Sequence, residues 1–155
     1  MNAGIAGLDA NCASDANKPS GGGTYKALVS DGTNRRACTT ANCGGGAGEH
    51  ISWVLKANKE YRRSNGTTVI GTTTANGIFT FPLTNSFQAT ITGTNAIVTG
   101  LNTDWTSNAN DCTDWTTNGG GANMSFAVHD DPTSATLSVG FQACSNTSKV
   151  VCVEQ

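Results

Sequence analysis

Apolar and polar residues alternate along this chain in short runs separated by turn-forming sequences. Near the N-terminus, Leu8 and Cys12 lie four residues apart, a spacing that places both side chains on one face of a short helix over residues 4–16. Pro19 ends this helix. The run at 24–29 (TYKALV) then has the composition of a strand. The pattern therefore predicts a helix followed by a strand at the start of the chain.

The strongest local signal is a β-hairpin. Residues 61–63 lead into Asn65-Gly66, and residues 67–70 lead out of it. Asn-Gly between two such runs is the strongest short-range signal for a hairpin. We therefore expect the end of the first strand to lie near an exposed tip.

The remaining apolar segments are less regular. The run at 78–81 is interrupted by Pro82, which cannot donate a hydrogen bond to a neighbouring strand. Residues 83–123 are mostly polar, and we expect them to be mostly irregular. Leu, Val and Phe alternate with Ser and Gly over 137–141, which predicts a half-buried strand. Residues 150–153 are apolar on both faces, which predicts a central strand at the end of the chain.

The composition supports many short strands joined by turns. The chain has 155 residues, with 23 Thr, 16 Asn and 19 Gly, and charged residues make up only 13%. That share is about half of the roughly 25% usual in globular domains. Thr favours strands, whereas Asn and Gly supply the positive φ angles of tight turns. The length fits a single domain over residues 1–155, with the uncharged polar surface typical of secreted proteins.

Six cysteines indicate disulfides rather than a metal site. No C-x2-C pair occurs, and His50 and His129 are far apart in the sequence, so the spacing typical of zinc ligands is absent. Three disulfides in an oxidising compartment are expected, although six cysteines allow fifteen sets of pairings. No apolar run approaches the ~20 residues of a membrane span. No signal peptide is visible at the N-terminus, so we expect that a leader, and any lipid tether with it, has been removed.

The basic residues are strongly segregated along the sequence. Although the net charge is −2, residues 64–148 contain no Lys or Arg and five Asp. If the fold brings the basic residues of the preceding part together, they form a patch that suits sulfated glycans or an acidic protein. The alternative is a solvated rim without a partner. The six residues concerned are Arg35, Arg36, Lys56, Lys59, Arg62 and Arg63.

Acidic residues and histidines offer little support for metal binding or catalysis. Ca²⁺ takes six to eight oxygen ligands, and five aspartates could supply some of them or could simply cap turns. A dyad of His129 with a neighbouring aspartate and a serine can be drawn, but such residues are common in loops, and we expect no enzyme. The aspartates are Asp104, Asp111, Asp114, Asp130 and Asp131.

Three tryptophans allow two interpretations. Trp53, Trp105 and Trp115 could form a stacking platform for sugars, or they could belong to the core. Trp115 lies three residues from Cys112, and a tryptophan packed against a disulfide favours the core. For Trp105 both interpretations remain open.

Several stretches, taken together, carry a family resemblance. The chain resembles the endostatin branch of the C-type-lectin-like fold, and within it the leptospiral endostatin-like surface proteins. The bacterial branch in particular is similar at residues 31–43 and 67–87. The stretches similar to the wider branch are GIAGLDANC (4–12), GTYKAL (23–28), the hairpin region 55–70, CTDW (112–115), and Cys144 with VCVEQ (151–155).

The resemblance implies an α+β fold of short, mainly antiparallel strands with one or two helices and three disulfides. The implied pairs are Cys12 with Cys152 and Cys112 with Cys144, which leaves Cys38 with Cys43. It also suggests a calcium-dependent sugar site, but the Glu-Pro-Asn, Gln-Pro-Asp and Trp-Asn-Asp tripeptides of such sites are absent. The N-terminal histidines that hold zinc in mammalian endostatins are absent too, so we expect no metal and no cofactor.

The function implied by the resemblance is that of an adhesin-like binding module on the bacterial outer-membrane surface. Its expected partners are host extracellular-matrix or complement-regulator proteins, and heparin-like glycans. We expect a monomer without a nucleic-acid partner, held at a membrane only through a removed lipid tether. A carbohydrate-binding lectin or a purely structural envelope domain is the alternative.

Overall fold

The computed structural model describes residues 3–89 and 96–155 of the chain. Over these residues it is an α+β structure with two α-helices, α1 (Gly4–Ser14) and α2 (Cys112–Trp115), and three 3₁₀ turns, η1 (Ala41–Cys43), η2 (Ala47–Glu49) and η3 (Ser134–Thr136). The strands in the described residues are β1 (Tyr25–Ala27), β2 (Glu60–Arg62), β3 (Val69–Thr72), β4 (Ala96–Val98), β5 (Asn123–Val128), β6 (Gly140–Ala143) and β7 (Cys152–Glu154).

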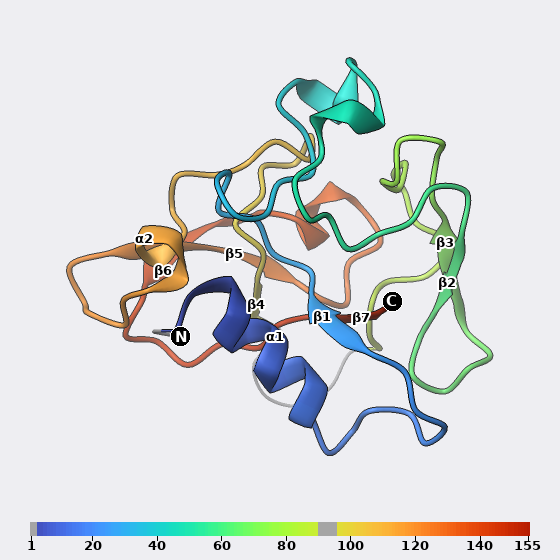
Figure 1. The fold of residues 1–155 in the computed structure, drawn as a ribbon, viewed down its shortest axis with the longest axis horizontal. Helices are drawn as coiled ribbons and strands as arrows, with labels where there is room; N and C mark the ends of the chain where they lie inside the picture. Colours follow the sequence, from blue (N-terminus) through green and yellow to red (C-terminus); the bar gives the residue numbers. More distant parts are fainter. Residues whose placement is uncertain (1–2, 90–95) are drawn as a thin grey trace.

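The strands form three small antiparallel sheets (Figure 1). β1 pairs with β7, β2 pairs with β3, and β4, β5 and β6 form a three-stranded sheet in that order. The β1–β7 pair joins the two ends of the chain, with Tyr25 opposite Glu154 and Ala27 opposite Cys152. The hairpin β2–β3 lies at one side of the molecule, apart from the other two sheets (Figure 1).

The three implied disulfides are confirmed. Cys12 pairs with Cys152, Cys38 with Cys43 and Cys112 with Cys144, with Cα–Cα distances of 5.5, 4.8 and 5.8 Å. The first bridge fastens α1 to the last strand across a sequence separation of 140 residues. It can do so because Cys12 lies on the inner face of the helix.

The predicted N-terminal helix and hairpin are also confirmed. Leu8 and Cys12 are the two buried residues of α1, as their four-residue spacing predicts. At the tip of the hairpin, Asn65 Oδ1 accepts the backbone N–H groups of Thr67 and Thr68 at 3.1 and 3.0 Å. Gly66 beside it has φ of 72°. Local turn chemistry therefore fixes this hairpin.

All three tryptophans belong to the core. Trp105 and Trp115 are fully buried, and Trp53 is 7% exposed. Each indole N–H donates to a backbone carbonyl; that of Trp105 reaches Phe79 at 3.1 Å, and that of Trp115 reaches Ser30 at 3.1 Å. The open question about Trp105 is thereby decided, and none of the three forms an exposed stacking platform.

Backbone conformation lets Trp115 approach its partner closely. All four residues of α2 have positive φ, between 54° and 61°, so this single turn is left-handed. Gly100, at φ of 64°, lies directly beside the Ser30 carbonyl, and a Cβ there would overlap its oxygen and the ring of Trp115. Only glycine fits this approach.

Two segments, 83–123 and 137–141, differ from what the sequence pattern predicts. Region 83–123, of which 90–95 lie outside the described residues, includes the buried strand β4 and the turn α2, neither of which the pattern predicts. The half-buried strand predicted at 137–141 is wrong. Leu137 is buried after η3, but β6 begins only at Gly140, and Val139 and Phe141 are 47% and 63% exposed. The alternation crosses a boundary between two elements, so it does not report one buried face.

The last strand is not central, contrary to prediction. Among the strands that the structure describes, β7 pairs with β1 alone. Val153 packs into the main hydrophobic cluster, with Val151 against it, whereas Cys152 is bonded to Cys12 of α1 on the other face. Its apolar character therefore reflects packing on both faces. One edge of β7 has no neighbouring strand in the described residues.

Candidate functional site: a groove between the hairpin and the last strand

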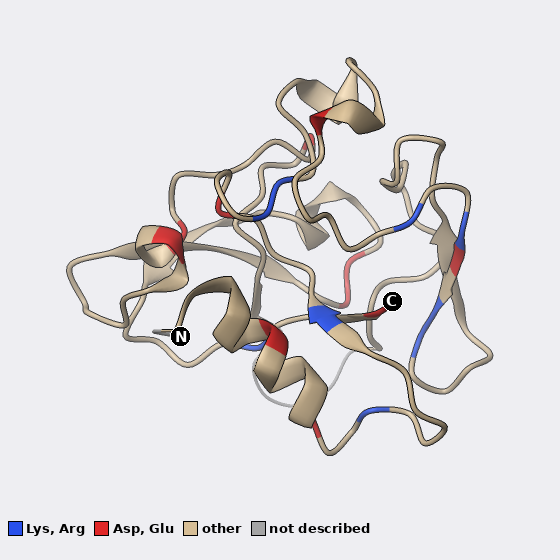
Figure 2. Ribbon diagram, in the orientation of Figure 1, with Lys and Arg blue, Asp and Glu red and all other residues tan. Residues whose placement is uncertain are grey.

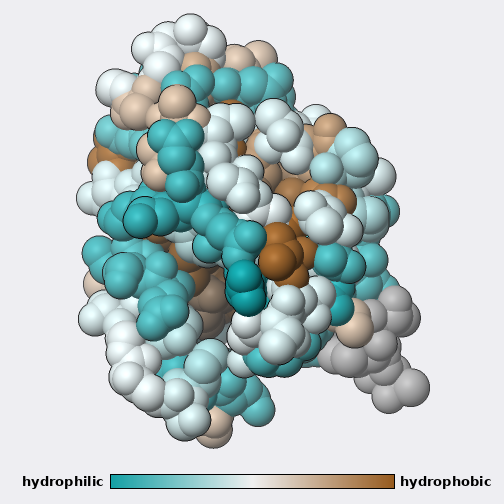
Figure 3. Space-filling view, turned by 90° about the vertical axis from the view of Figure 1, so that its right-hand side faces the viewer, coloured by the Kyte–Doolittle hydropathy of each residue, from teal (hydrophilic) through white to brown (hydrophobic). Residues whose placement is uncertain are grey.

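A groove of about 950 Å³ lies between the hairpin β2–β3 and strand β7. It is bounded by the end of α1 and the loop that follows it, by residues of the hairpin, and by the last six residues of the chain. On the face that carries the hairpin, a hydrophilic ridge stands beside a recess in which apolar side chains are visible (Figure 3). We refer to this space as the groove.

Apolar side chains contributed by distant parts of the sequence line the inner surface of the groove. Ile70 comes from β3, Val151 and Val153 from the last segment, and Phe87 from the loop after the hairpin. Ile70, Phe87 and Val153 are each less than 9% exposed, so they form the packed floor of the groove.

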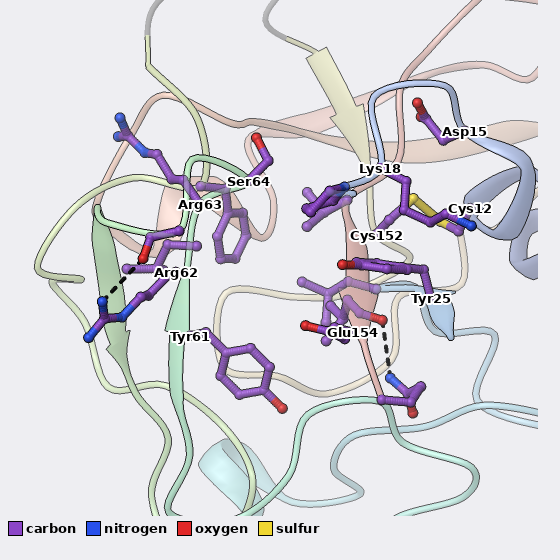
Figure 4. Close-up of a pocket in the computed structure, with 18 of the residues that line it drawn as sticks. Cys12, Asp15, Lys18, Tyr25, Tyr61, Arg62, Arg63, Ser64, Cys152 and Glu154 are labelled. Carbon is purple, nitrogen blue, oxygen red and sulfur yellow. Dashed lines mark hydrogen bonds between the residues drawn. A yellow bond between two sulfur atoms is a disulfide. The ribbon is translucent and has the colours of Figure 1, made fainter. Parts of the chain in front are cut away.

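Two tyrosines point into the groove from opposite walls (Figure 4). Tyr61 of β2 packs edge-on against Phe79, with ring centroids 5.7 Å apart, and its hydroxyl oxygen accepts the Lys56 N–H at 2.8 Å. Tyr25 of β1 faces it from the other side. Burial raises the pKa of both phenols, and the charge of Glu154 adds to the effect at Tyr25. Both rings therefore remain neutral and present a hydroxyl at neutral pH.

The rim of the groove is rich in charge. Its cations come from the α1–β1 loop and from the segment around β2 (Figure 2), and its carboxylates are Asp15, Glu60 and Glu154. Arg62 and Glu60 form an exposed ion pair at 2.7 Å, so they largely neutralise one another. The cations are Lys18, Lys56, Lys59, Arg62 and Arg63.

Four of the six basic residues singled out in the sequence line this groove, but with different roles. Lys56 and Lys59 are exposed. The guanidinium of Arg63 donates to the backbone and hydroxyl oxygens of Ser86 at 2.9 and 2.8 Å, and Figure 4 shows Arg62 and Arg63 directed away from the groove. The lysines are therefore the cations most available to a ligand.

Arg35 and Arg36 do not join the other four, so the fold does not bring the six basic residues together, and the hypothesis of one patch made of all six is wrong. Arg35 is 2% exposed and forms a two-point ion pair with Asp9, its Nη1 and Nη2 atoms lying 2.8 and 2.7 Å from the carboxylate oxygens. It also donates to the carbonyls of Ala27 and Ser52 at 2.8 and 3.1 Å. Four of the five N–H donors of this guanidinium are thus bonded inside the protein, so Arg35 is a structural residue and is unavailable to an external ligand.

Arg36 is half-buried against η2. Its Nε donates to the Glu49 carbonyl at 3.0 Å. The Glu49 carboxylate in turn accepts hydrogen bonds from the hydroxyls and N–H groups of Thr40 and Thr39 and from the Gly45 N–H. These bonds, those of Thr40 first, lower the pKa of Glu49 to about 2. This network stabilises the loop that the Cys38–Cys43 bridge also constrains, and none of its residues lines the groove.

The acidic residues do not assemble into a metal site in the described part of the chain, where no group of three or more His, Cys, Asp or Glu could hold an ion. Asp104 and Asp131 instead accept bonds from Thr106 and Thr133 in their own turns. Asp111 accepts the Asp114 N–H at 3.1 Å. These aspartates act as turn caps.

His129 is buried at 4% exposure, and neither of its ring nitrogens has a hydrogen-bond partner among the described residues. Burial lowers its pKa. The dyad that can be drawn for it in the sequence is therefore not formed, because neither ring nitrogen hydrogen-bonds a serine or a carboxylate in the part of the chain that the structure describes. That the protein is not an enzyme stays a prediction.

Sequence reasoning missed the second wall of the groove. Tyr25 and Lys18 carry no motif, and the wall exists because β1 and β7 pair across the whole length of the chain. The implied Cys12–Cys152 bridge could have indicated this wall, because it places residues near the two ends of the chain side by side.

The fold and the groove define a small α+β domain that is cross-linked by three disulfides and open along one side. The chain belongs to a family described as a protein of unknown function (DUF1554), whose family model matches residues 1–129. No curated protein and no solved structure matches the chain. Three disulfides suggest an oxidising, extracytoplasmic location. No helix in the described residues is long and apolar enough to cross a membrane.

Proposed function

We propose that this protein is a non-catalytic binding module displayed outside the cell, which holds an extended, negatively charged ligand in the groove. The observation that carries the proposal is an open groove with an apolar floor, two inward-facing tyrosines and a rim with exposed lysines. The proposed ligands are host extracellular-matrix or complement-regulator proteins, or heparin-like sulfated glycans.

The shape of the groove favours a segment of a polymer over an enclosed small molecule. Its volume of about 950 Å³ lies at the upper end of the ~300–1,000 Å³ usual for small-molecule sites. Its recess lies open to the surface (Figure 3), so a chain can enter and leave along it. The exposed lysines supply attraction that is weak singly and grows with the number of contacts.

The finer assignments belong to the same proposal. We infer that the protein is an endostatin-like member of the C-type-lectin-like fold. We also infer that it is attached to the outer-membrane surface through a lipid tether ahead of the domain. The helix, the first strand, the hairpin and the disulfide pairing agree with those that the resemblance implies, which supports this assignment. An adhesin-like role suits a domain whose ends are fastened together at one place.

The test is binding of the protein to immobilised heparin and to laminin as salt is raised. Lys56→Ser/Lys59→Ser is expected to elute at clearly lower salt than the parent, because two rim charges are lost. Lys26→Ser is the control, because this substitution also removes one positive charge, but on β1 and outside the groove. Each single lysine variant of the rim is compared with it.

If the double variant binds as tightly as the parent at low salt, the groove is not the ligand site. Equal losses in Lys26→Ser and in the single rim variants would show that only net charge matters. Binding that requires Ca²⁺ and is competed by simple sugars would favour the lectin alternative instead.

A further inference from the structure

We infer that the groove takes an extended polypeptide segment as an added β-strand, paired with the free edge of β7. This rests on the proposed function and names the ligand class: a peptide strand with apolar side chains at alternate positions and acidic residues among the others. A sulfated glycan is the competing class, which the experiment separates.

The first observation is the free edge of β7. In the β1–β7 ladder, the Val151 carbonyl accepts the Leu28 N–H at 2.8 Å, and the Gln155 N–H donates to Thr24 at 2.9 Å. In an antiparallel ladder, the residues that bond across it alternate with residues that turn their N–H and C=O groups away. Cys152 and Glu154 are the residues turned away from β1.

These outward groups have no partner in the described chain. No other strand pairs with β7, and no side chain bonds the backbone N–H or C=O of Cys152 or Glu154. Both residues line the groove. A row of unpaired donors and acceptors at strand spacing is the template for pairing with another chain.

The opposite wall repeats the arrangement. In the hairpin, Lys59 accepts the Thr73 N–H, and Arg63 donates to Thr68, both at 2.9 Å. Glu60 and Arg62 lie at the alternate positions of β2, so their backbone groups turn away from β3, and both residues line the groove. The groove thus lies between two strand edges that lack partners in the described chain (Figure 4).

The residues of the floor and of the rim indicate which side chains the added strand must have. Side chains of a strand point alternately to its two sides, so every second residue of the ligand meets Ile70, Phe87 and Val151. Apolar residues are expected there. The residues between them face the rim, where Lys56 and Lys59 favour acidic side chains. Main-chain bonds supply affinity, and the alternate side chains supply selectivity.

The test uses a displayed library of random linear peptides of about twelve residues, selected on the intact, disulfide-bonded protein. Enriched peptides are synthesised and their affinities measured for two variants of one position, Glu154→Ala and Glu154→Pro. Both lose the carboxylate, but only proline removes the outward N–H. That N–H makes no bond to β1, so proline is tolerated at this edge position.

The expected result is enrichment of alternating apolar and acidic peptides that bind Glu154→Pro at least about tenfold more weakly than Glu154→Ala. A melting temperature for the proline variant close to that of the alanine variant shows that the fold is kept. As a check that needs no variant, N-methylation of alternate peptide amides, in the register that faces β7, abolishes binding to the unmodified protein, whereas methylation in the other register is tolerated better.

Equal affinity for the two variants, or equal tolerance of both N-methyl registers, overturns strand addition. Failure of the library to yield any peptide that binds in the groove overturns it as well. If a heparin oligosaccharide then binds and Lys56→Ser/Lys59→Ser weakens it, the proposed function stands without the added strand. If neither peptides nor heparin bind, both proposals fail.

Discussion

The buried ion pair between Asp9 and Arg35 offers the sharpest test of how this fold is held together. We predict that Asp9→Asn destabilises the protein by about 3 kcal/mol, at the low end of the ~3–5 kcal/mol found when one partner of a buried pair is removed. Arg35 is 2% exposed, but the Asp9 side chain is 22% exposed, so water partly screens the charge left behind.

The contacts of the Asp9 carboxylate account for this loss of stability. The Asp9 carboxylate accepts both terminal nitrogens of Arg35 at 2.8 and 2.7 Å and the Ala27 N–H at 2.9 Å. Burial alone would raise the pKa of Asp9, but the guanidinium and the Ala27 N–H lower it below its usual value. Asparagine keeps one oxygen, yet it places an NH₂ group against Arg35. One charge-assisted bond, worth about 1.5–3 kcal/mol, is lost, and Arg35 is left uncompensated.

The assay is urea unfolding with the disulfides intact, in which the midpoint should fall while the slope stays unchanged. For a chain of this size the melting temperature should drop by about 6–12 °C. Asp15→Asn is the matched control, because Asp15 is exposed just beyond α1 and forms no ion pair with the described residues. Its carboxylate accepts hydrogen bonds only from its exposed neighbour Asn17 there, through an oxygen that asparagine keeps, so this change should cost less than about 0.5 kcal/mol.

A double-mutant cycle made of Asp9→Leu, Arg35→Met and the double variant Asp9→Leu/Arg35→Met tests the pair itself. The double variant leaves no unpaired charge, so it should be less destabilised than the sum of the two single variants. A loss below about 1 kcal/mol for Asp9→Asn, with a normal slope, would show that Arg35 is satisfied by backbone carbonyls alone and would refute the reasoning.

Two further predictions concern covalent and acid stability. Replacing Cys12 and Cys152 by Ser should cost about 5 kcal/mol in the chain-entropy model, against about 2 for the same change at Cys38 and Cys43, because the closed loops differ so much in length; equal losses in calorimetry would contradict it. The pKa of Glu49 is lowered from 4.5 to about 2, so its stabilising effect is complete above pH 4.5 and is lost as the pH falls towards 2. Glu49→Gln should flatten the stability–pH curve in that window, and an unchanged curve would argue against the hydrogen-bond network.

Local chemistry predicted the elements that depend on neighbouring residues. Asn65-Gly66 specifies a turn whatever surrounds it, and the spacing of Leu8 and Cys12 marks the buried face of a helix. Both elements form as expected. The disulfide pairing, in contrast, came from the family resemblance, because six cysteines allow many pairings and only a shared fold selects one.

Elements whose burial is set by distant partners could not be predicted in this way. β4 has only three residues, too few for a period to be visible, and it is a strand because β5 pairs with it. Residues 137–141 alternate like a buried strand, yet they span the end of η3 and the start of β6, so Leu137 is buried whereas Phe141 is exposed.

The same distinction applies to the candidate site. The sequence by itself determined that this is a disulfide-bonded α+β chain with its cations concentrated in one region. Only the tertiary structure decided that Arg35 is buried against Asp9 while Lys56 and Lys59 face solvent, since burial depends on what packs against each side chain. It also decided that β7 keeps a free edge beside the hairpin. Apolar sequence reports that a strand is covered on its faces, whereas hydrogen bonding at its edges depends on neighbours that the sequence does not name.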